Sequence, residues 1–392
     1  MLVFTYTANP LRMLDLTARA EAPGLRLTAL VDQRLESVFA PHRSHFDRIY
    51  YVPVDYSHHC FVEAFGAVAL DAVASEAHRS PDLRLLSFFE GDIEATAALR
   101  DRFGLPGTTA AAIRRCRDKL LMKAAVRERG HSVPEAVGLD FSTDPAELFA
   151  LCESRLGLPF LVKPARLVGS LGVNRVRCYP DFEDCARHRL DTSYFAEQEI
   201  SGELMHLDLV IDDDGPAWFG CSDYNRSTLD FGAGRPVGSM PILPNHPRHS
   251  EWRDYAVDIA GALGIQAGLA HIEVIRTAGD LYFIEAAARA SGGLVTAVYR
   301  EMFGYNMIQA EFRRCLGLGY QPGRPGGLAH FWAMLPECSE VPRRLDARGV
   351  SSTTFPASAG PRIPGSLIGR YDTLLASHPD YDHLRDVFTA LV

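Results

Sequence analysis

The stretch Ala270–Gly293 constrains the fold more than any other part of the chain, because it predicts a β-hairpin that carries two carboxylates. It reads AHIEVIRTAGDLYFIEAAARASGG. Each half alternates in the manner of a strand and is rich in Ile, Val, Tyr and Phe, and a short glycine-containing turn separates the halves. In the expected register Thr277 pairs with Leu281 across this turn. Glu273 then lies directly opposite Glu285, on the same face of the sheet.

Two carboxylates that face each other across a sheet repel unless a cation lies between them. Glu273 and Glu285 therefore predict a hard divalent cation with oxygen ligands, above all Mg²⁺, with Mn²⁺ as a substitute. Arg289 follows after a short step, and Ser291 and Gly292 begin a segment where backbone can approach an anion closely. Carboxylates followed by a guanidinium indicate a polyphosphate and a second anionic group. The alternative is a hairpin with solvated glutamates.

Composition limits the classes of partner. The chain has 392 residues, with a formal net charge of -9, which argues against nucleic acid or an anionic membrane as a partner. Its 8 cysteines form no C-x-x-C pair and are expected to be reduced thiols rather than disulfides or zinc ligands. The N-terminal residues lack the pattern of a signal peptide, and no apolar run is long enough to span a bilayer. These features predict a cytoplasmic protein.

The first hundred residues alternate between strand and helix patterns, which predicts a parallel α/β sheet. The loop after the first strand has no G-x-G-x-x-G, so a nicotinamide site is not expected there. The strands are expected at Leu2–Thr5, Leu27–Val31 and Leu83–Phe89, and a helix at Phe61–His78.

Further along, an apolar strand at Phe160–Pro164 ends with Lys163, and a lysine in such a place usually has an anionic partner. The following loop contains Gly169, Ser170 and Gly172, and the chain then returns as a strand. Walker A loops and Rossmann turns both open a helix, so this unit is neither. A flexible flap whose amides cover phosphates is the functional interpretation.

The segment Tyr224–His249 is long, poor in periodicity and rich in Gly, Pro, Arg and Asn. Loops of this length in a compact domain are usually functional or disordered. Arg226 and Arg235 lie within it, and arginine suits bidentate capture of a substrate carboxylate. Alternatively, both arginines are solvated or pair with nearby aspartates.

Taken together, the motifs VKPARLVGSLGV, EQEISGE and HIEVIRTAGDLYFIEAAARASGG resemble, in this order and spacing, the ATP-grasp superfamily. The resemblance covers residues 105 to 317 and is greatest to the carboxylate–amine ligases that include L-amino-acid (dipeptide) ligases. It implies an α/β protein whose ATP-grasp part is α+β. The implied domains are a Rossmann-like domain at 1–104, a central and lid subdomain at 105–193, a subdomain with the Mg-ATP and acceptor sites at 194–322, and a small β-rich lobe at 323–392.

The resemblance also implies roles for individual residues. Lys163 and Arg289 are the catalytic candidates, Arg289 as the group that stabilises an acyl phosphate. The metal ligands are Glu273 and Glu285, and Arg226, Arg235, Ser291 and Gly292 are candidate substrate contacts. The ATP contacts are Lys119 and Lys163 on the phosphates, Gly169, Ser170 and Gly172 in the lid, Glu197, Gln198 and Ile200 at the adenine hinge, and Glu203 on the ribose.

The implied reaction is ATP-dependent formation of an amide bond between small molecules, expected to be amino acids. It passes through an acyl phosphate and releases ADP and phosphate, and a homodimer is expected. Many relatives have Asn two residues after the second metal-binding glutamate, where this chain has Ala287, which leaves the number of bound metals open. Two alternatives remain: a biotin-carboxylase-like carboxylation, and an ATP-binding regulatory protein without catalysis.

Overall fold

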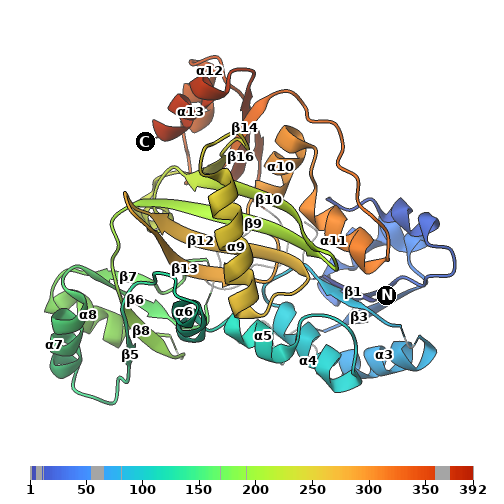
Figure 1. The fold of residues 1–392 in the computed structure, drawn as a ribbon, viewed down its shortest axis with the longest axis horizontal. Helices are drawn as coiled ribbons and strands as arrows, with labels where there is room; N and C mark the ends of the chain where they lie inside the picture. The colour runs from blue at the N-terminus through green and yellow to red at the C-terminus, as the bar shows by residue number, and fades with distance from the viewer. Residues whose placement is uncertain are drawn as a thin grey trace.

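The structure is a computed structural model that describes residues 2–5, 11, 13–53, 66–80, 82–167, 169–190, 192–357 and 371–391. In this part of the chain the strands form three sheets, one of eight strands and two of four (Figure 1). The α-helices are α2 (Glu36–Phe39), α3 (Gly66–Arg79), α4 (Ile93–Phe103), α5 (Ala110–Arg115), α6 (Lys119–Glu128), α7 (Pro145–Leu156), α8 (Tyr179–Arg187), α9 (His249–Leu263), α10 (Val295–Phe303), α11 (Met307–Cys315), α12 (Val341–Asp346) and α13 (Tyr381–Thr389). The 3₁₀ helices are η1 (Leu16–Glu21), η2 (Gln33–Leu35), η3 (Ala40–His45) and η5 (Thr228–Ala233).

The N-terminal sheet is parallel, as the alternation of strands and helices predicts. Its order is β3-β2-β1-β4, and each pair of neighbouring strands is parallel. The strands are β1 (Leu2–Thr5), β2 (Thr28–Asp32), β3 (Arg48–Val52) and β4 (Leu85–Ser87). The helix expected at Phe61–His78 is observed as α3, and its first five expected residues lie outside the described part.

The second sheet is antiparallel, in the order β5-β8-β6-β7. Its strands are β5 (Ala136–Leu139), β6 (Phe160–Pro164), β7 (Asn174–Val176) and β8 (Tyr194–Gln198). Helices α7 and α8 cover it through a core that includes Phe160 and Phe182, both fully buried. Because β8 pairs with β5 and β6, the predicted boundary between residues 193 and 194 cuts this sheet, and the break lies after Gln198 instead.

The third and largest sheet runs in the order β13-β12-β9-β10-β11-β14-β16-β15. Its strands are β9 (Glu203–Asp212), β10 (Gly215–Tyr224), β11 (Val237–Pro241), β12 (Gly268–Arg276), β13 (Leu281–Ala287), β14 (Ala329–Met334), β15 (Ser351–Phe355) and β16 (Thr373–His378). Helix α9 lies across β9 and β10 (Figure 1). It buries Trp252, Ile259 and Leu263 against the sheet. An apolar side chain of this size contributes roughly 1.5–3 kcal/mol when fully buried.

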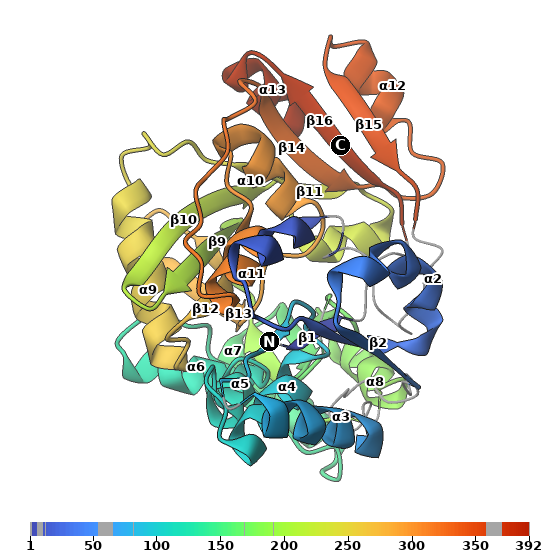
Figure 2. The same cartoon turned by 90° about the vertical axis from the view of Figure 1, so that its right-hand side faces the viewer.

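The C-terminal residues extend this sheet rather than forming a sheet of their own. Strand β14 pairs with β11, and β16 lies between β14 and β15, with α12 and α13 beside them (Figure 2). The expected separate lobe at 323–392 is therefore corrected to a continuation of the large sheet. The long segment Tyr224–His249 is also more regular than expected, because it contains the buried strand β11 and the 3₁₀ helix η5.

The β12–β13 hairpin reaches the expected pairing by a different route. Arg276, not Thr277, pairs with Leu281, so the predicted first pair is wrong by one residue. A bulge at Ile284 adds one residue to β13, and beyond it Glu273 pairs with Glu285 as predicted. The register error and the bulge cancel, so both carboxylates end on one face.

Two expectations about the whole chain can be compared with the described residues. None of their helices is both long and apolar enough to cross a membrane. Their seven cysteines are all free, as expected; Cys60 lies outside the described part.

Candidate active site

A cavity of about 560 Å³ lies between the second sheet and the large sheet. Its lining comes from β6, β8, β9, β10, β12 and β13, and also from η5 and α13. The predicted site residues on its wall are Lys119, Lys163, Ser170, Glu197, Gln198, Ile200, Glu203, Arg226, Glu273 and Glu285. Residues that are more than 150 positions apart in the sequence thus meet in one place.

Each of the two predicted ATP lysines already holds a carboxylate. Asp118 caps α6 by accepting hydrogen bonds from the next turn, which places Lys119 at the start of the helix. The Lys119 ammonium lies 3.1 Å from Glu285 and donates to the Leu167 carbonyl at 2.7 Å. Lys163, at the end of β6, pairs with Glu197 of β8. The phosphates of a nucleotide would compete with these carboxylates for the lysines.

Sequence reasoning missed a third lysine. Lys123 lies one turn after Lys119 on α6, contacts Glu197 at 2.6 Å and donates to the Ile284 carbonyl at 3.1 Å. Its side chain is buried, and burial lowers its pKa although Glu197 opposes this effect. Burial raises the pKa of Glu197, but Lys123 and Lys163 outweigh it and hold that carboxyl below its usual value. The i, i+4 spacing of the two lysines was the available signal.

Glu273 is held in place before any metal arrives. It accepts a hydrogen bond from the Tyr224 hydroxyl at 2.9 Å, and the Nε2 atom of His271 lies 3.5 Å from the same oxygen. Burial raises the pKa of Glu273, but the bonds from His271 and Tyr224 outweigh it and keep the pKa below its usual value. Its partner Glu285 has a side chain that is 35% exposed and faces the cavity. The pair offers oxygen donors, which fit Mg²⁺.

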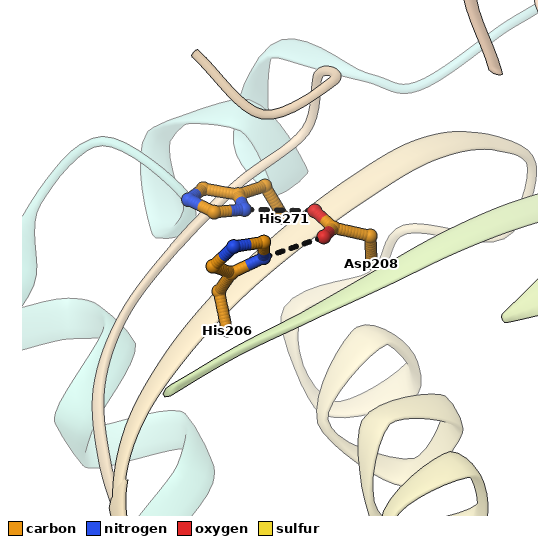
Figure 3. Close-up of side chains that lie close together, drawn as sticks. All are labelled: His206, Asp208 and His271. Carbon is orange, nitrogen blue, oxygen red and sulfur yellow. Dashed lines mark hydrogen bonds and ion pairs between the residues drawn. The ribbon is translucent and has the colours of Figure 1, made fainter. Parts of the chain in front are cut away.

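Next to Glu273 lies a buried polar cluster that sequence reasoning also missed. Figure 3 shows three of its residues, His206, Asp208 and His271. Asp208 accepts hydrogen bonds from the Nδ1 atoms of His206 and His271, at 2.6 and 2.8 Å. Tyr299 and Ser291 also donate to this carboxylate. Burial raises the pKa of Asp208, but the two histidines outweigh it and hold the pKa far below its usual range.

Ligand atoms of His206, Asp208 and His271 all lie within 4.8 Å of one another, so the cluster resembles a metal site. Hydrogen bonds already occupy these atoms, and the second nitrogen of His206 meets the Ser239 hydroxyl at 2.8 Å. The cluster therefore serves as a satisfied network that orients His271 toward Glu273. Polar residues at alternate positions of both strands, in HLD and HIE, were the signal for it.

The predicted lid has the backbone that its glycines suggested. Gly169, Ser170 and Gly172 all have positive φ angles, of 63, 57 and 70°. A Cβ atom at Gly172 would lie 2.9 Å from the Pro164 ring, so this position requires glycine. The Ser170 hydroxyl donates to Thr228 of η5 at 3.0 Å, which connects the lid to the far wall of the cavity.

The hinge and ribose candidates also line the cavity. Gln198 and Ile200 border it at the end of β8. Glu203 begins β9 and pairs with Arg276 at 2.6 Å. The Arg276 guanidinium also lies 3.0 Å from Asp223 of β10, so a row of charges closes this end of the sheet.

The substrate candidates separate into two groups. Arg226 lines the cavity, where it donates to the Leu391 carbonyl and its buried Nε has no hydrogen-bond partner among the described residues. Arg235 is exposed and lies outside the lining. Ser291 points to Asp208, and Gly292 is exposed outside the lining. The substrate roles of these last three residues remain predictions.

Arg289 has a different environment from the one expected for a group on the acyl phosphate. Its guanidinium pairs with buried Glu90 and donates to the Ala290 carbonyl at 2.7 Å. It lines a second cavity rather than the first. Contact with an acyl phosphate would require it to leave Glu90, so this role also remains a prediction.

Helix α13 forms a wall of the first cavity that no motif indicated. Arg385, Phe388 and Thr389 line the cavity. Arg385 pairs with Asp223 and donates to the Tyr381 hydroxyl at 3.0 Å. The helix has an ordinary amphipathic sequence, and only the pairing of β14 with β11 brings it here.

The chain resembles known proteins in sequence and in fold. No protein-family model matches the chain. An L-arginine-specific L-amino acid ligase of Bacillus subtilis is 26% identical over 236 residues, which cover 58% of this chain and 56% of that protein. D-alanine–D-alanine ligase A of Salmonella typhimurium is 26% identical over 216 residues, 52% of this chain and 56% of that protein. The chain thus matches about half the length of these curated relatives.

Solved structures match over nearly the whole chain. An L-amino acid ligase from Bacillus licheniformis has a TM-score of 0.73 at 20% identity and covers 100% of this chain and 96% of that one. N5-carboxyaminoimidazole synthetase from Staphylococcus aureus, complexed with ADP, has a TM-score of 0.67 at 13% identity and covers 99% and 96%. These matches show the fold. Together with the sequence relatives, they confirm the family resemblance that the motifs predict.

Proposed function

We propose that the chain is an ATP-grasp protein, and more closely an ATP-dependent carboxylate–amine ligase that joins two small molecules by an amide bond. The observation that carries the proposal is the cavity in which Glu273 and Glu285 face each other beside Lys119 and Lys163. Two carboxylates and two lysines are the groups that hold a metal-bound triphosphate. Amino-acid ligation is the activity that the names of two similar proteins give for those proteins.

The donor set suits Mg²⁺, or Mn²⁺ in its place, which when bound would offset charge on the transferring phosphoryl group. Glu273 and Glu285 would hold the ion. Lys119, released from Glu285, and Lys163, released from Glu197, would hold phosphate oxygens. Lys123 stays with Glu197, so this buried carboxylate keeps a cation when Lys163 moves.

In the first step an oxygen of the substrate carboxylate attacks the γ-phosphorus of ATP. The bond between that phosphorus and the bridging oxygen of ADP breaks, and an acyl phosphate forms. This chain contributes position and charge, because the lysines hold the phosphates in line and the lid residues Gly169 to Gly172 exclude water. The adenine and ribose would lie against Gln198, Ile200 and Glu203.

In the second step the neutral amine attacks the acyl carbon, the carbon–oxygen bond to phosphate breaks, and the nitrogen loses a proton. The products are the amide, ADP and inorganic phosphate. Arg226 is the candidate contact for a substrate carboxylate. It lines the cavity, and its guanidinium donates no hydrogen bond to a carboxylate of the described residues. A homodimer, a cytoplasmic location and the Rossmann-like domain predicted at 1–104 remain part of this proposal.

The test is ADP release from the purified chain with ATP and Mg²⁺, screened over pairs of amino acids, with mass spectrometry of the products. Hydroxylamine added with the acid alone should trap the acyl phosphate as a hydroxamate. An amide product that requires both substrates supports the proposal. Turnover that depends on bicarbonate and biotin would replace it with the carboxylase alternative, and ATP binding without ADP under any mixture would replace it with the regulatory one.

A further inference from the structure

A second cavity, of about 420 Å³, shares no lining residue with the first, which is the proposed nucleotide cavity. It is bounded by β4 and α4 of the N-terminal domain, by α5, and by the β9–β10 turn and the start of β12. The volume is in the range of small-molecule sites. Its charged lining residues are Arg84, Arg100, Arg115, Arg289, Arg314, Asp213 and Glu311.

The lining contains five arginines and two carboxylates, so it carries an excess of positive charge, whereas the whole chain has a formal net charge of -9. Arg314 is neutralised inside the cavity, since it makes two hydrogen bonds to Glu311, at 2.7 and 2.8 Å, and lies 3.6 Å from Asp213. Arg289 is neutralised by Glu90. Three arginines remain.

Within the described part of the chain, Arg84, Arg100 and Arg115 donate side-chain hydrogen bonds only to backbone carbonyls. Arg84 bonds to the carbonyl of residue 314 at 3.1 Å, and Arg115 to that of residue 263 at 3.3 Å. Arg100 bonds to the carbonyls of residues 85 and 108, at 2.6 and 3.3 Å. Among the described residues none of the three forms an ion pair with a carboxylate.

Arg100 carries the strongest indication. Its Nε atom is buried and has no hydrogen-bond partner among the described residues. Burial lowers the pKa of this guanidinium, which means that the surroundings do not stabilise its charge fully. A buried cation with one unmet donor costs free energy unless an anion completes it.

Two glycines give the arginines room. A Cβ atom at Gly107 would lie 2.8 Å from Nε of Arg100, and one at Gly264 would lie 2.8 Å from a terminal nitrogen of Arg115. Both glycines have positive φ angles, 129 and 81°. Glycine at these positions therefore lets each guanidinium group approach the backbone closely.

We propose that this second cavity binds a small oxyanion, the phosphate or carboxylate groups of a metabolite, through Arg84, Arg100 and Arg115. Planar guanidinium groups match both kinds of oxyanion with paired hydrogen bonds, and three of them balance two or three negative charges. A ligand here bridges the N-terminal domain and the large sheet, so its binding stabilises the two against each other.

The experiment measures thermal unfolding and calorimetric binding of the full chain, without nucleotide, at constant ionic strength. The probes are inorganic phosphate and citrate, with chloride as the reference. Saturable binding, with a rise in Tm, is expected for at least one probe, and the stronger of the two identifies the source as phosphate or carboxylate.

Variants locate the site. Arg115→Gln and Arg84→Gln should each weaken the probe's Kd by about 10-fold or more, as expected for loss of a charged hydrogen bond. Arg114→Gln is the matched control, since Arg114 is an exposed neighbour on α5 outside the cavity wall. Lys119→Met tests the other cavity and should leave the probe's affinity unchanged within about twofold.

Two results would overturn the proposal. One is the absence of saturable binding by both probes in the wild-type chain. The other is binding that Lys119→Met abolishes while Arg115→Gln and Arg84→Gln preserve it, which would place the anion in the nucleotide cavity. Neither result bears on ligase activity, which is measured with ATP in a separate assay.

Discussion

The two cavities of this protein balance positive charge in opposite ways. In the first, Lys119 and Lys163 rest on carboxylates that a nucleotide would displace. In the second, Arg84, Arg100 and Arg115 rest on carbonyls, which carry no net charge. The first cavity is therefore prepared for a ligand that arrives with its own cation, and the second for an anion alone.

This difference follows from what each ligand must do. A triphosphate that brings Mg²⁺ needs carboxylates for the metal and lysines for the phosphates, so both charges must be present in the empty site. Lysine–carboxylate pairs also keep the empty cavity stable, because a buried unpaired charge is costly. An anion that is only bound, and not transformed, needs no such exchange of partners.

The largest expected effect tests whether the first cavity's carboxylates hold a metal or only neutralise lysines. Glu285→Gln should lower ATP turnover about 10²–10³-fold, since the amide no longer supplies charge to the ion. The fold should persist, because the Glu285 side chain is 35% exposed. ADP release at saturating Mg²⁺ measures the first effect and circular dichroism the second.

Asp254→Asn provides the control for Glu285→Gln. Asp254 is an exposed carboxylate on α9 that lines neither cavity, and its change should leave turnover unchanged. Turnover near the wild-type value for Glu285→Gln at saturating Mg²⁺ would show that these carboxylates serve only to neutralise lysines, and the comparison of the cavities would lose its basis.

The next prediction compares the two cavities by the free energy of unfolding of one variant from each. Lys163→Met leaves buried Glu197 with Lys123 alone and should lower the free energy of unfolding by about 3 kcal/mol. Arg115→Met removes a charge that no described carboxylate balances, so it should change that free energy by less than about 0.5 kcal/mol. Denaturant unfolding of the two variants makes the comparison, and equal losses would contradict it.

The smallest effect concerns Glu90, which pairs with Arg117 at 2.7 Å and with Arg289, a residue of the second cavity's wall. Burial raises its pKa, but the two arginines outweigh burial and lower it to about 2. Because the folded pKa lies below the unfolded value of 4.5, this stabilisation is present above pH 4.5 and is lost as the pH falls toward 2.

Between pH 4.5 and 2.5 the wild-type chain should therefore lose on the order of 2 kcal/mol of unfolding free energy through Glu90. Glu90→Gln lacks this group and should show a shallower acid slope. Denaturant unfolding across this pH range measures both slopes. Parallel slopes would mean that Glu90 does not couple the second cavity's Arg289 to the N-terminal domain.

The sequence predicts well those site residues that lie on short, regular segments. Strand alternation placed Glu273 and Glu285 on one face, and Ser170 of the glycine-containing loop after Lys163 does line the cavity. The pairing of the glutamates survived a wrong register only because the bulge at Ile284 compensated for it. Bulges depend on local packing and leave little trace in a hydrophobic pattern.

The remaining site residues depend on contacts between distant segments. Lys123 reaches Glu197 only when α6 lies against β8, and Asp208 meets His271 only through the pairing of β9 with β12. Buried strand β11, with its glycine and proline, resembled a loop in sequence. Such residues are placed by tertiary structure, which periodicity along a single chain does not describe.

The position of α13 has a consequence for how the protein is made. One wall of the nucleotide cavity comes from Lys119 and another from Arg385 and its neighbours. A ribosome synthesises the chain from the N-terminus, so the N-terminal domain and the second sheet emerge long before α13. The proposed nucleotide site is therefore incomplete while most of the chain is being translated, and the nascent protein must hold its early domains together without a bound nucleotide.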